Sequence, residues 1–381
     1  MDRIKRFVCI GVPDSVCNLK CQYCYLRYCG TQKHSFKDFK VDVNTFRRAL
    51  SKGRLGGVCM FNFTSNGETL LNLKIIDYAV ALIEEGHYVE IVTNATNVKA
   101  IRQICELPRR VLSHLMLKCS FHYLELERVG LMDVFFDNVN LVWRSGASIT
   151  VELMPTDELL PYRQKIYDLC MHRIGAPCHL TVARNPAVPN RLPLLSKLSY
   201  EEYANAWEMF DSELFRYKMK ELESHPLGFC YAGDWMMFFN PMTGMMSQCY
   251  SGYRRINIFK DIDARLKFKA IGNHCRQPYC FNAHAWLTFG CIPGHDAPYY
   301  DEVRNRKCED GREWLQPEMK SFFHQKFGEN NSEYATCKKI FINIEMTVRS
   351  VLFFPVSLGG RIMHLLIPMK VLSMIKNVLM R

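Results

Sequence analysis

Six short apolar segments, separated by stretches with helical periodicity, occupy the first 185 residues of this 381-residue chain. We expect strands at 7–12, 58–64, 89–94, 115–121, 149–154 and 180–184. Amphipathic stretches lie between them at 70–85, 99–107, 131–144 and 158–172. Strands that alternate with helices are typical of parallel βα units. The first half of the chain is therefore predicted to be an α/β domain, with its chemistry at the carboxyl ends of the strands.

Three cysteines follow the first predicted strand at the spacing C-x3-C-x2-C, namely Cys17, Cys21 and Cys24. Three thiolates this close together can hold three irons of a [4Fe–4S] cluster and leave the fourth iron without a protein ligand. A small molecule would then complete the coordination. The alternatives are a three-cysteine zinc knuckle with a distant fourth ligand, or chance in a chain with 17 cysteines.

The triplet, with the aromatic Tyr23 directly before its third cysteine, resembles that of the radical S-adenosylmethionine (SAM) superfamily. The resemblance covers roughly the first half of the chain and implies a partial (β/α)6 barrel. It implies that SAM chelates the open iron, and that an electron cleaves SAM to a 5′-deoxyadenosyl radical that abstracts a hydrogen atom from substrate. An electron donor such as flavodoxin or ferredoxin is implied as well.

Asn66, Gly67 and Glu68 follow the second predicted strand, where the superfamily usually has Gly-Gly-Glu-Pro. Asn66 and Thr69 depart from that pattern. We expect Gly67 to allow a positive φ and Glu68 to accept a hydrogen bond from the SAM ammonium group. The alternative is an ordinary strand-to-helix turn, with Glu68 in the first turn of the helix.

Other polar residues at predicted strand ends are candidates for contact with SAM or substrate. Thr93, Asn94 and Ser120 suit the ribose hydroxyls and the carboxylate of SAM. Arg184 would pair with the SAM carboxylate or with a substrate anion. His122 is the candidate proton donor or acceptor. The alternatives are ordinary turn chemistry, a solvated arginine and a histidine that is merely hydrogen-bonded.

A second cysteine-rich region begins with a predicted hairpin of strands at 235–239 and 245–248, joined by a Pro/Gly turn. Four thiolates from this region could hold a second [4Fe–4S] cluster or a zinc ion. The pattern resembles the auxiliary-cluster domain called Twitch, a shortened relative of SPASM, and Cys291 and Cys308 are further candidates. The expected ligands are Cys230, Cys249, Cys275 and Cys280.

The chain is predicted to have four parts: a radical SAM core (1–185), a linker and helix (186–228), an auxiliary-cluster domain (229–310) and a helical, apolar-basic tail (311–381). A capping box at Ser199 predicts a helix to about residue 213. A further helix is expected at 314–327.

The net charge of +11 is spread widely, without an RNA-binding aromatic signature or an arginine-rich tract, so no nucleic-acid partner is expected. Seventeen cysteines without a signal peptide predict a cytoplasmic protein. Residues 340–381 combine apolar runs with five cations and have no acid after Glu345. This composition fits helices on the anionic inner face of a membrane, or helices packed on the barrel or a partner.

These patterns together predict an oxidoreductase-type radical SAM enzyme with SAM, a catalytic [4Fe–4S] cluster and a second, auxiliary [4Fe–4S] cluster. The expected substrate is a carbohydrate or envelope-polymer intermediate, or a peptide. The rival hypothesis is a non-catalytic zinc or iron–sulfur protein on a βα scaffold that acts in interaction or redox sensing.

Overall fold

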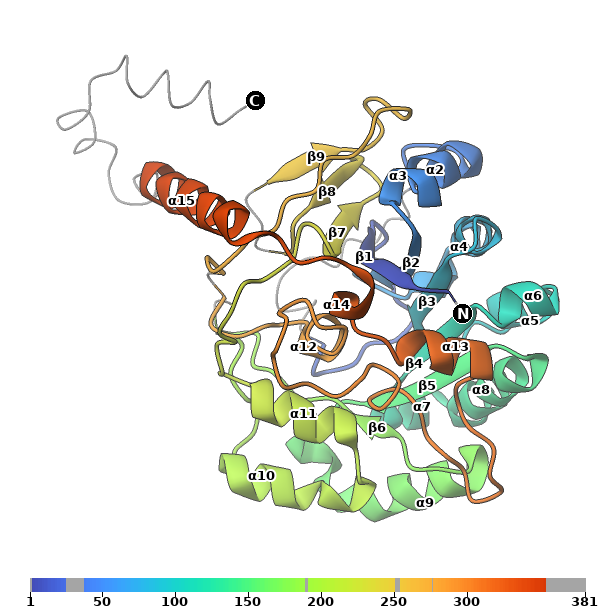
Figure 1. The fold of residues 1–381 in the computed structure, drawn as a ribbon. Coiled ribbons are helices and arrows are strands. Elements are labelled where there is room, and N and C mark those ends of the chain that lie inside the picture. The colour runs from blue at the N-terminus through green and yellow to red at the C-terminus, as the bar shows by residue number, and fades with distance from the viewer. Residues whose placement is uncertain (1, 25–37, 189–190, 251–253, 276, 354–381) are drawn as a thin grey trace.

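The computed structural model describes the chain except for residues 1, 25–37, 189–190, 251–253, 276 and 354–381. Within these limits the strands form one sheet in the order β6-β5-β4-β3-β2-β1-β7-β8-β9 (Figure 1). The strands are β1 (Ile4–Val12), β2 (Val58–Ser65), β3 (Tyr88–Thr93), β4 (Leu115–Phe121), β5 (Ser148–Leu153), β6 (His179–Leu180), β7 (Met236–Asn240), β8 (Met245–Ser247) and β9 (Arg255–Asn257).

The first six strands pair in parallel, each beside its neighbour in the chain. This confirms the α/β class and the largely parallel sheet predicted from the alternating pattern. The sixth strand is shorter than expected, because β6 ends at Leu180. Arg184 instead forms an isolated bridge with Leu194, so it does not end a strand.

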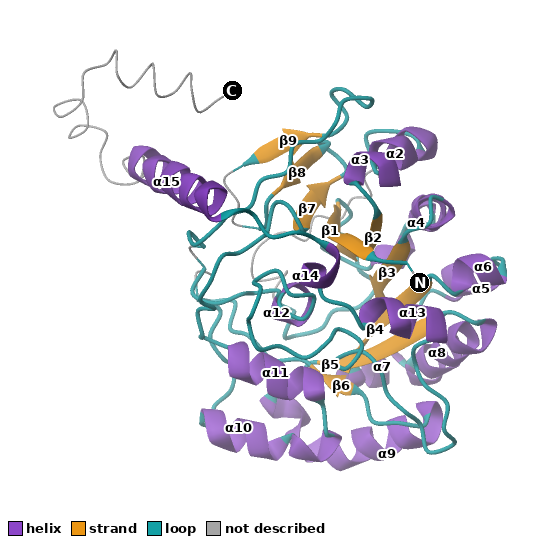
Figure 2. Cartoon of the chain, viewed as in Figure 1, coloured by secondary structure: helices purple, strands orange, loops and turns teal. Residues whose placement is uncertain are grey.

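Helices cover one face of these six strands, while loops and short helices cover the other (Figure 2). The first layer buries apolar side chains such as Ile101, Phe135 and Ile166 against the sheet. Its helices are α2 (Val43–Ala49), α3 (Lys52–Leu55), α4 (Lys74–Glu84), α5 (Val98–Cys105), α6 (Arg109–Leu112), α7 (Tyr123–Val129), α8 (Met132–Ser145) and α9 (Arg163–Ile174), with 3-10 turns at η1 (Thr69–Leu71) and η2 (Asp157–Tyr162).

Residues from the second half of the chain fill the opposite, inner face of the sheet. Tyr88 of β3 stacks on Phe322 at a ring-centroid distance of 3.7 Å, and Phe7 of β1 lies 5.7 Å from Phe289. The helix predicted at 314–327 is divided in two, because His324 leaves the helical conformation. The short helices of this layer are α12 (Ala283–Trp286), α13 (Pro317–Phe323) and α14 (Phe327–Asn330).

The capping box at Ser199 is present and opens α10 (Tyr200–Ala206). The helix is shorter than predicted, because Trp207 leaves the helical conformation directly after Ala206. Asp211 takes a left-handed conformation (φ 44°) and ends the 3-10 turn that follows. The chain then continues through η3 (Glu208–Phe210) into α11 (Glu213–Glu221).

The predicted hairpin is confirmed by the antiparallel pairing of β7 with β8. Its place in the fold was not predicted. β7 pairs in parallel with β1, so that the hairpin extends the sheet of the first half of the chain. The second cysteine-rich region is thereby held against the edge of the βα core.

The last described helix, α15 (Thr336–Phe353), projects from the body of the molecule (Figure 1). Its side chains Ile342 and Met346 are buried, and Asn343 accepts a hydrogen bond from the backbone of Asn273 at 3.0 Å. Among the described residues, no helix combines the length and the apolar composition that crossing a bilayer requires.

Candidate active site

The loop after β1 carries Cys17, Cys21 and Cys24, and none of these thiols forms a disulfide. Burial, followed by the negative charge of neighbouring thiols and carboxylates, raises the pKa of Cys17 to about 11 and of Cys21 to about 12. Each thiol therefore lies in the electrostatic field of the others. A bound cation would reverse this effect, because a coordinating metal stabilises the thiolate.

The first part of this cysteine loop is tied to the carboxyl end of β2. Ser65 Oγ donates to the carbonyl of Asp14 at 2.5 Å, and the Glu68 amide donates to the carbonyl of Val16 at 2.8 Å. These bonds join the residues just before Cys17 to the turn that follows β2. Two sequence regions about 50 residues apart thus form one structural unit.

The next part of the loop is tied to the segments after β3 and β4. Asn94 Nδ2 donates to Asn18 Oδ1 at 2.8 Å, and Asn18 Nδ2 donates to Thr96 Oγ1 at 2.8 Å. The amide of Lys20 donates to Glu125 Oε1, in the first turn of α7, at 2.6 Å. Alternate residues of the cysteine loop are therefore anchored across successive strand ends, which fixes its path.

Gly67 lies where the loop and the β2 turn approach most closely. A Cβ at this position would lie 2.1 Å from the carbonyl oxygen of Val16 and 2.8 Å from the carbonyl carbon of Ser15. The positive φ that we expected is wrong, since Gly67 is absent from the residues with that geometry in the described chain. Glycine is needed here because the backbone of another segment occupies the space of a side chain.

Glu68 joins the ends of β2 and β3 through its carboxylate. Its Oε1 accepts from the Leu70 amide at 2.9 Å and from the Thr93 hydroxyl, and its Oε2 accepts from the Asn94 amide at 2.6 Å. Burial raises the pKa of Glu68, and these three hydrogen bonds act in the opposite direction. The predicted residues Glu68, Thr93 and Asn94 do lie together, but these contacts are with one another.

Replacing Glu68 by Gln is expected to destabilise the strand ends. A carboxamide has only one acceptor oxygen, so its NH2 group would face one of the three donors. A buried donor left unsatisfied costs about 1–3 kcal/mol in unfolding free energy. Denaturant unfolding should therefore show a lower midpoint for Glu68→Gln than for the exposed control Glu84→Gln, and equal midpoints would contradict this role.

Tyr23 and His122 connect the cysteine loop to the end of β4. The Tyr23 hydroxyl lies 2.6 Å from His122 Nδ1. Burial lowers the pKa of His122 to about 4, so the imidazole is neutral at pH 7, and burial raises the pKa of Tyr23. His122 is thus hydrogen-bonded to the cysteine loop, and its role as a proton donor or acceptor stays a prediction. Ser120 is half-buried on β4, and Asn66 is exposed.

Arg184 contacts the second cysteine-rich region. Its Nη1 donates to the carbonyl of Phe281 at 3.1 Å, directly after Cys280. Its hydrogen bond therefore joins the end of the βα core to the other group of cysteines.

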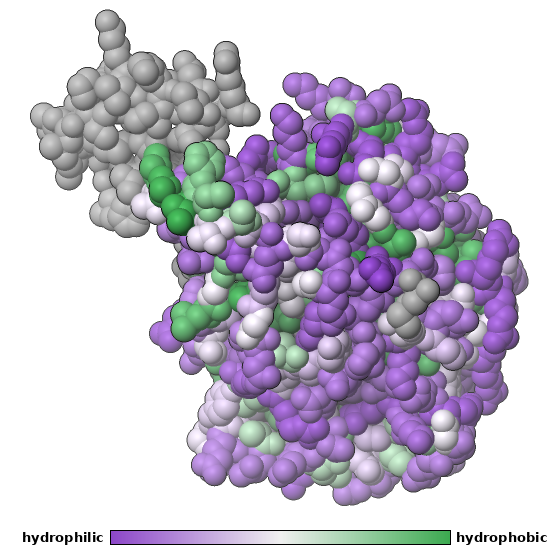
Figure 3. Space-filling model, viewed as in Figure 1, coloured by the Kyte–Doolittle hydropathy of each residue, from purple (hydrophilic) through white to green (hydrophobic). Residues whose placement is uncertain are grey.

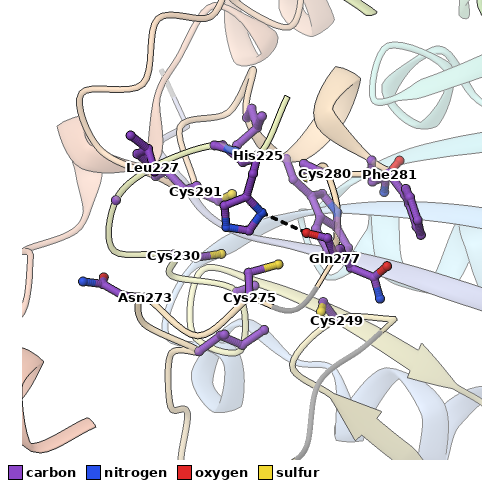
Figure 4. Close-up of a pocket in the computed structure, with 18 of the residues that line it drawn as sticks. His225, Leu227, Cys230, Cys249, Asn273, Cys275, Gln277, Cys280, Phe281 and Cys291 are labelled. Carbon is purple, nitrogen blue, oxygen red and sulfur yellow. Dashed lines mark hydrogen bonds between the residues drawn. The ribbon is translucent and has the colours of Figure 1, made fainter. Parts of the chain in front are cut away.

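Five cysteines line a cavity of about 200 Å³ between the hairpin and α12 (Figure 4). They comprise the four expected from the sequence and one further candidate, Cys291. The Cys291 thiol donates to the sulfur of Cys230, which lowers the pKa of Cys230 and raises that of Cys291. The cysteines that line this cavity are Cys230, Cys249, Cys275, Cys280 and Cys291.

Backbone pairing brings these cysteines together from distant parts of the chain. Cys230 and Gly272 exchange two backbone hydrogen bonds of 3.2 and 3.0 Å, and the Tyr231 amide donates to the carbonyl of Cys291 at 2.8 Å. Cys308 lies elsewhere, with its thiol 3.4 Å from the carbonyl of Ile174. In the part of the chain that is described, no three His, Cys, Asp or Glu side chains form a ligand set for a single metal ion.

No protein-family model and no curated protein matches this chain. Solved structures that match include SuiB of Streptococcus suis bound to SAM, with 14% identity, a TM-score of 0.47, and coverage of 68% of this chain and 64% of that one. The chain thus spans less than two thirds of the length of SuiB.

Two further matches are anSMEcpe with bound AdoMet and Cp18Cys peptide, and BtrN in complex with AdoMet and 2-DOIA. The anSMEcpe structure has 15% identity and a TM-score of 0.44, and the match covers 68% of this chain and 78% of that one. The BtrN structure has 13% identity and a TM-score of 0.29, and the match covers 72% of this chain and 79% of that one. All three structures contain bound SAM, which is also written AdoMet. At these levels of similarity, the case for function rests on the chain's own residues.

Proposed function

We propose that this chain is a radical SAM enzyme, which cleaves SAM reductively and abstracts a hydrogen atom from its substrate. The observation that carries the proposal is the cysteine loop, with three thiols in one electrostatic neighbourhood, anchored across the ends of β2, β3 and β4. Six parallel strands in chain order are consistent with a partial (β/α)6 barrel around that loop.

Cys17, Cys21 and Cys24 would hold three irons of the catalytic cluster. When bound, a [4Fe–4S] cluster with SAM supplies the one-electron chemistry that yields a 5′-deoxyadenosyl radical. The chain itself holds the loop in place through Val16 and Asn18. Neutral His122, paired with the Tyr23 hydroxyl, fixes the residue next to Cys24 and so acts as a positioning residue.

The cysteine-lined cavity would hold a second [4Fe–4S] cluster, in a Twitch-like region. Five thiols are available for four positions, since Cys291 stands beside Cys230. The donor set fits because thiolates are the usual ligands of iron–sulfur clusters. Zinc prefers four such ligands too, so metal analysis decides between the two.

Replacing Cys230 and Cys249 together by Ala is expected to remove the second cluster and leave the first assembled. Iron in the anaerobically reconstituted protein should fall from about eight to about four per chain. Cys308→Ala, which removes a thiol outside the cavity, serves as the control and should retain full iron. Tightly bound zinc together with a single iron–sulfur cluster in anaerobically purified protein would contradict this assignment.

We also propose that α15 contacts an anionic membrane surface. Ile340, Phe341 and Ile344 are 54–63% exposed, and an apolar patch covers this helix in Figure 3. Residues 340–381 carry five cations and no acid after Glu345, which complements the negative charge of a cytoplasmic leaflet.

Replacing Phe341 and Ile344 together by Ser should weaken binding to liposomes. The intact protein should co-sediment with anionic vesicles, and less of it should do so at high salt. Salt screens the attraction between the cations and the membrane, with a screening length of about 8 Å at physiological ionic strength that shortens as salt is added. Substitution is preferable to truncation at residue 340, since Ile342 and Met346 of the same helix are buried. If the intact protein stays in the supernatant at low salt, the membrane proposal fails.

A further inference from the structure

A group of charged side chains lies on the inner face of the sheet, beside the second cysteine-rich region. Lys118 Nζ of β4 lies 3.3 Å from Glu152 Oε1 of β5, and the same carboxylate forms an ion pair with Arg304. Lys218 of α11 donates to the hydroxyl of Thr181. Glu152 therefore forms ion pairs with two cations, Lys118 and Arg304.

The positions in the sheet explain why these side chains meet. Successive residues of a strand point to opposite faces, so Met116, Lys118 and Ser120 of β4 share the inner face. Ser120 is opposite Glu152 in the register with β5, and Met116 is opposite Glu90 in the register with β3. Glu152 thus lies level with Ser120, near the carboxyl end of β4, and Lys118 precedes Ser120 on the same face of that strand.

The second carboxylate of this face, Glu90, is already engaged. The hydroxyl of Tyr300 donates to Glu90 Oε2 at 2.6 Å, and the amide of Asn62 donates to Oε1. The guanidinium of Arg304 lies 4.7 Å from the centre of the Tyr300 ring. Glu90 is held by neutral donors, which leaves Glu152 as the carboxylate in direct contact with the cations.

Arg304 is buried, and part of its guanidinium lacks hydrogen-bond partners within the described part of the chain. The residue is 0% exposed, and its Nε and Nη2 have no hydrogen-bond partner among the described residues. Buried guanidinium groups are normally paired and fully hydrogen-bonded, because an unpaired buried donor costs free energy. Acceptor oxygens, from water or from a bound anion, would satisfy these two donors.

The cations also destabilise one another. Burial, followed by the charges of Arg184, Lys118 and Arg304, lowers the pKa of Lys218, with Glu152 acting in the opposite direction. The pKa of His284 is lowered by burial and by the same group of cations. A negatively charged ligand would offset this repulsion.

We infer that the four cations Lys118, Arg184, Lys218 and Arg304, here termed the basic cluster, bind a phosphoryl group of the substrate. Glu152 contacts Lys118 and Arg304, and the negative charge of Glu90 acts on Arg304 without direct contact, so that two of the four positive charges are balanced. A phosphate monoester carries about −1.5 to −2 at pH 7 with three strong acceptor oxygens. A carboxylate would leave one cation uncompensated. That the bound phosphoryl group belongs to the substrate rests on the proposed function. The existence of an anion site does not depend on that function.

The location favours a substrate group over the carboxylate of SAM. Arg184 is bonded to the carbonyl of Phe281, next to Cys280, and His284 lies one turn further along the chain. The basic cluster therefore borders the second cysteine-rich region. A phosphoryl group held there would orient the remainder of the substrate towards Ser120 and the cysteine loop.

Inorganic phosphate is the probe for this site. Calorimetric titration of the anaerobically purified full chain should show phosphate binding, with sodium chloride used to equalise ionic strength. Lys218→Met should weaken that binding about ten- to a hundredfold, as expected for losing a hydrogen bond to a charged group. Lys220→Met is the matched control, because Lys220 lies on the same helix but is exposed and pairs with Asp296.

Lys118→Met provides a second variant if Lys218→Met does not fold, and the same loss of affinity is expected. Absence of phosphate binding by the unmodified protein, or equal affinity in the folded variant, would overturn the inference. Weakened SAM binding in that variant, with phosphate competing against SAM, would assign the basic cluster to the SAM carboxylate and overturn it too. Phosphate binding without any formation of 5′-deoxyadenosine would refute the proposed function yet support the anion site.

Discussion

Replacing Cys17, Cys21 and Cys24 together by Ala is expected to abolish reductive cleavage of SAM. Without these thiolates the chain has no ligands for the cluster that would bind SAM, whereas the cysteine-lined cavity remains complete. Iron should fall to the share of the second site, about four per chain. The measurement is 5′-deoxyadenosine formed after dithionite and SAM are added under anaerobic conditions.

Cys337→Ala is the control for this triple variant, since it removes an exposed thiol outside both groups of cysteines. It should retain full iron and full formation of 5′-deoxyadenosine. If the triple variant forms 5′-deoxyadenosine at the undiminished rate, the cysteine triplet is not the site of SAM cleavage.

The second large effect is expected at Gly67. In Gly67→Ala, the new methyl group would meet the Val16 carbonyl oxygen at 2.1 Å, and this atom belongs to the backbone that leads into Cys17. Overpacking of this kind typically costs about 1–3 kcal/mol, and backbone cannot rotate away as a side chain can. We expect a lower unfolding midpoint together with loss of iron from the first site.

Gly53→Ala is the matched control for that substitution. Gly53 lies in α3, and a Cβ there meets no heavy atom within 4 Å. Alanine favours a helix over glycine by about 1 kcal/mol, so this variant should be as stable as the unmodified protein or slightly more so. Unchanged iron and stability in Gly67→Ala would show that the loop and the turn do not need their close approach.

Local patterns predicted the elements of the core well. β4 has the predicted limits of 115–121, and the capping box at Ser199 is present, because both depend on neighbouring residues alone. The pairing of β7 with β1 could not be predicted, since strand periodicity does not indicate which edge of a sheet a hairpin will join.

The sequence predicted where the residues of the candidate site lie more accurately than which partners they contact. Glu68, Thr93 and Asn94 lie where parallel strand ends should bring them, yet their hydrogen bonds connect protein segments to one another. Those partners depend on the path of the cysteine loop, which sequence spacing does not reveal. Sequence spacing also does not reveal the position of Cys291, which is held beside the cavity by a hydrogen bond from the Tyr231 amide to its carbonyl.

The basic cluster could not be predicted from the sequence. Lys118, Lys218 and Arg304 are far apart in the chain, and each sits in a segment of ordinary composition. Only the register of β4 and β5 and the packing of α11 bring them together. Buried charge of this kind is recognised from the structure, because an isolated cation in a sequence is usually solvated.

Anaerobic reconstitution of the full chain with iron and sulfide, followed by dithionite and SAM, tests the central claim most directly. We predict about eight irons per chain and formation of 5′-deoxyadenosine that requires both dithionite and SAM. Protein that instead retains zinc, takes up no iron–sulfur cluster and forms no 5′-deoxyadenosine would contradict the claim and favour a non-catalytic metal-binding protein.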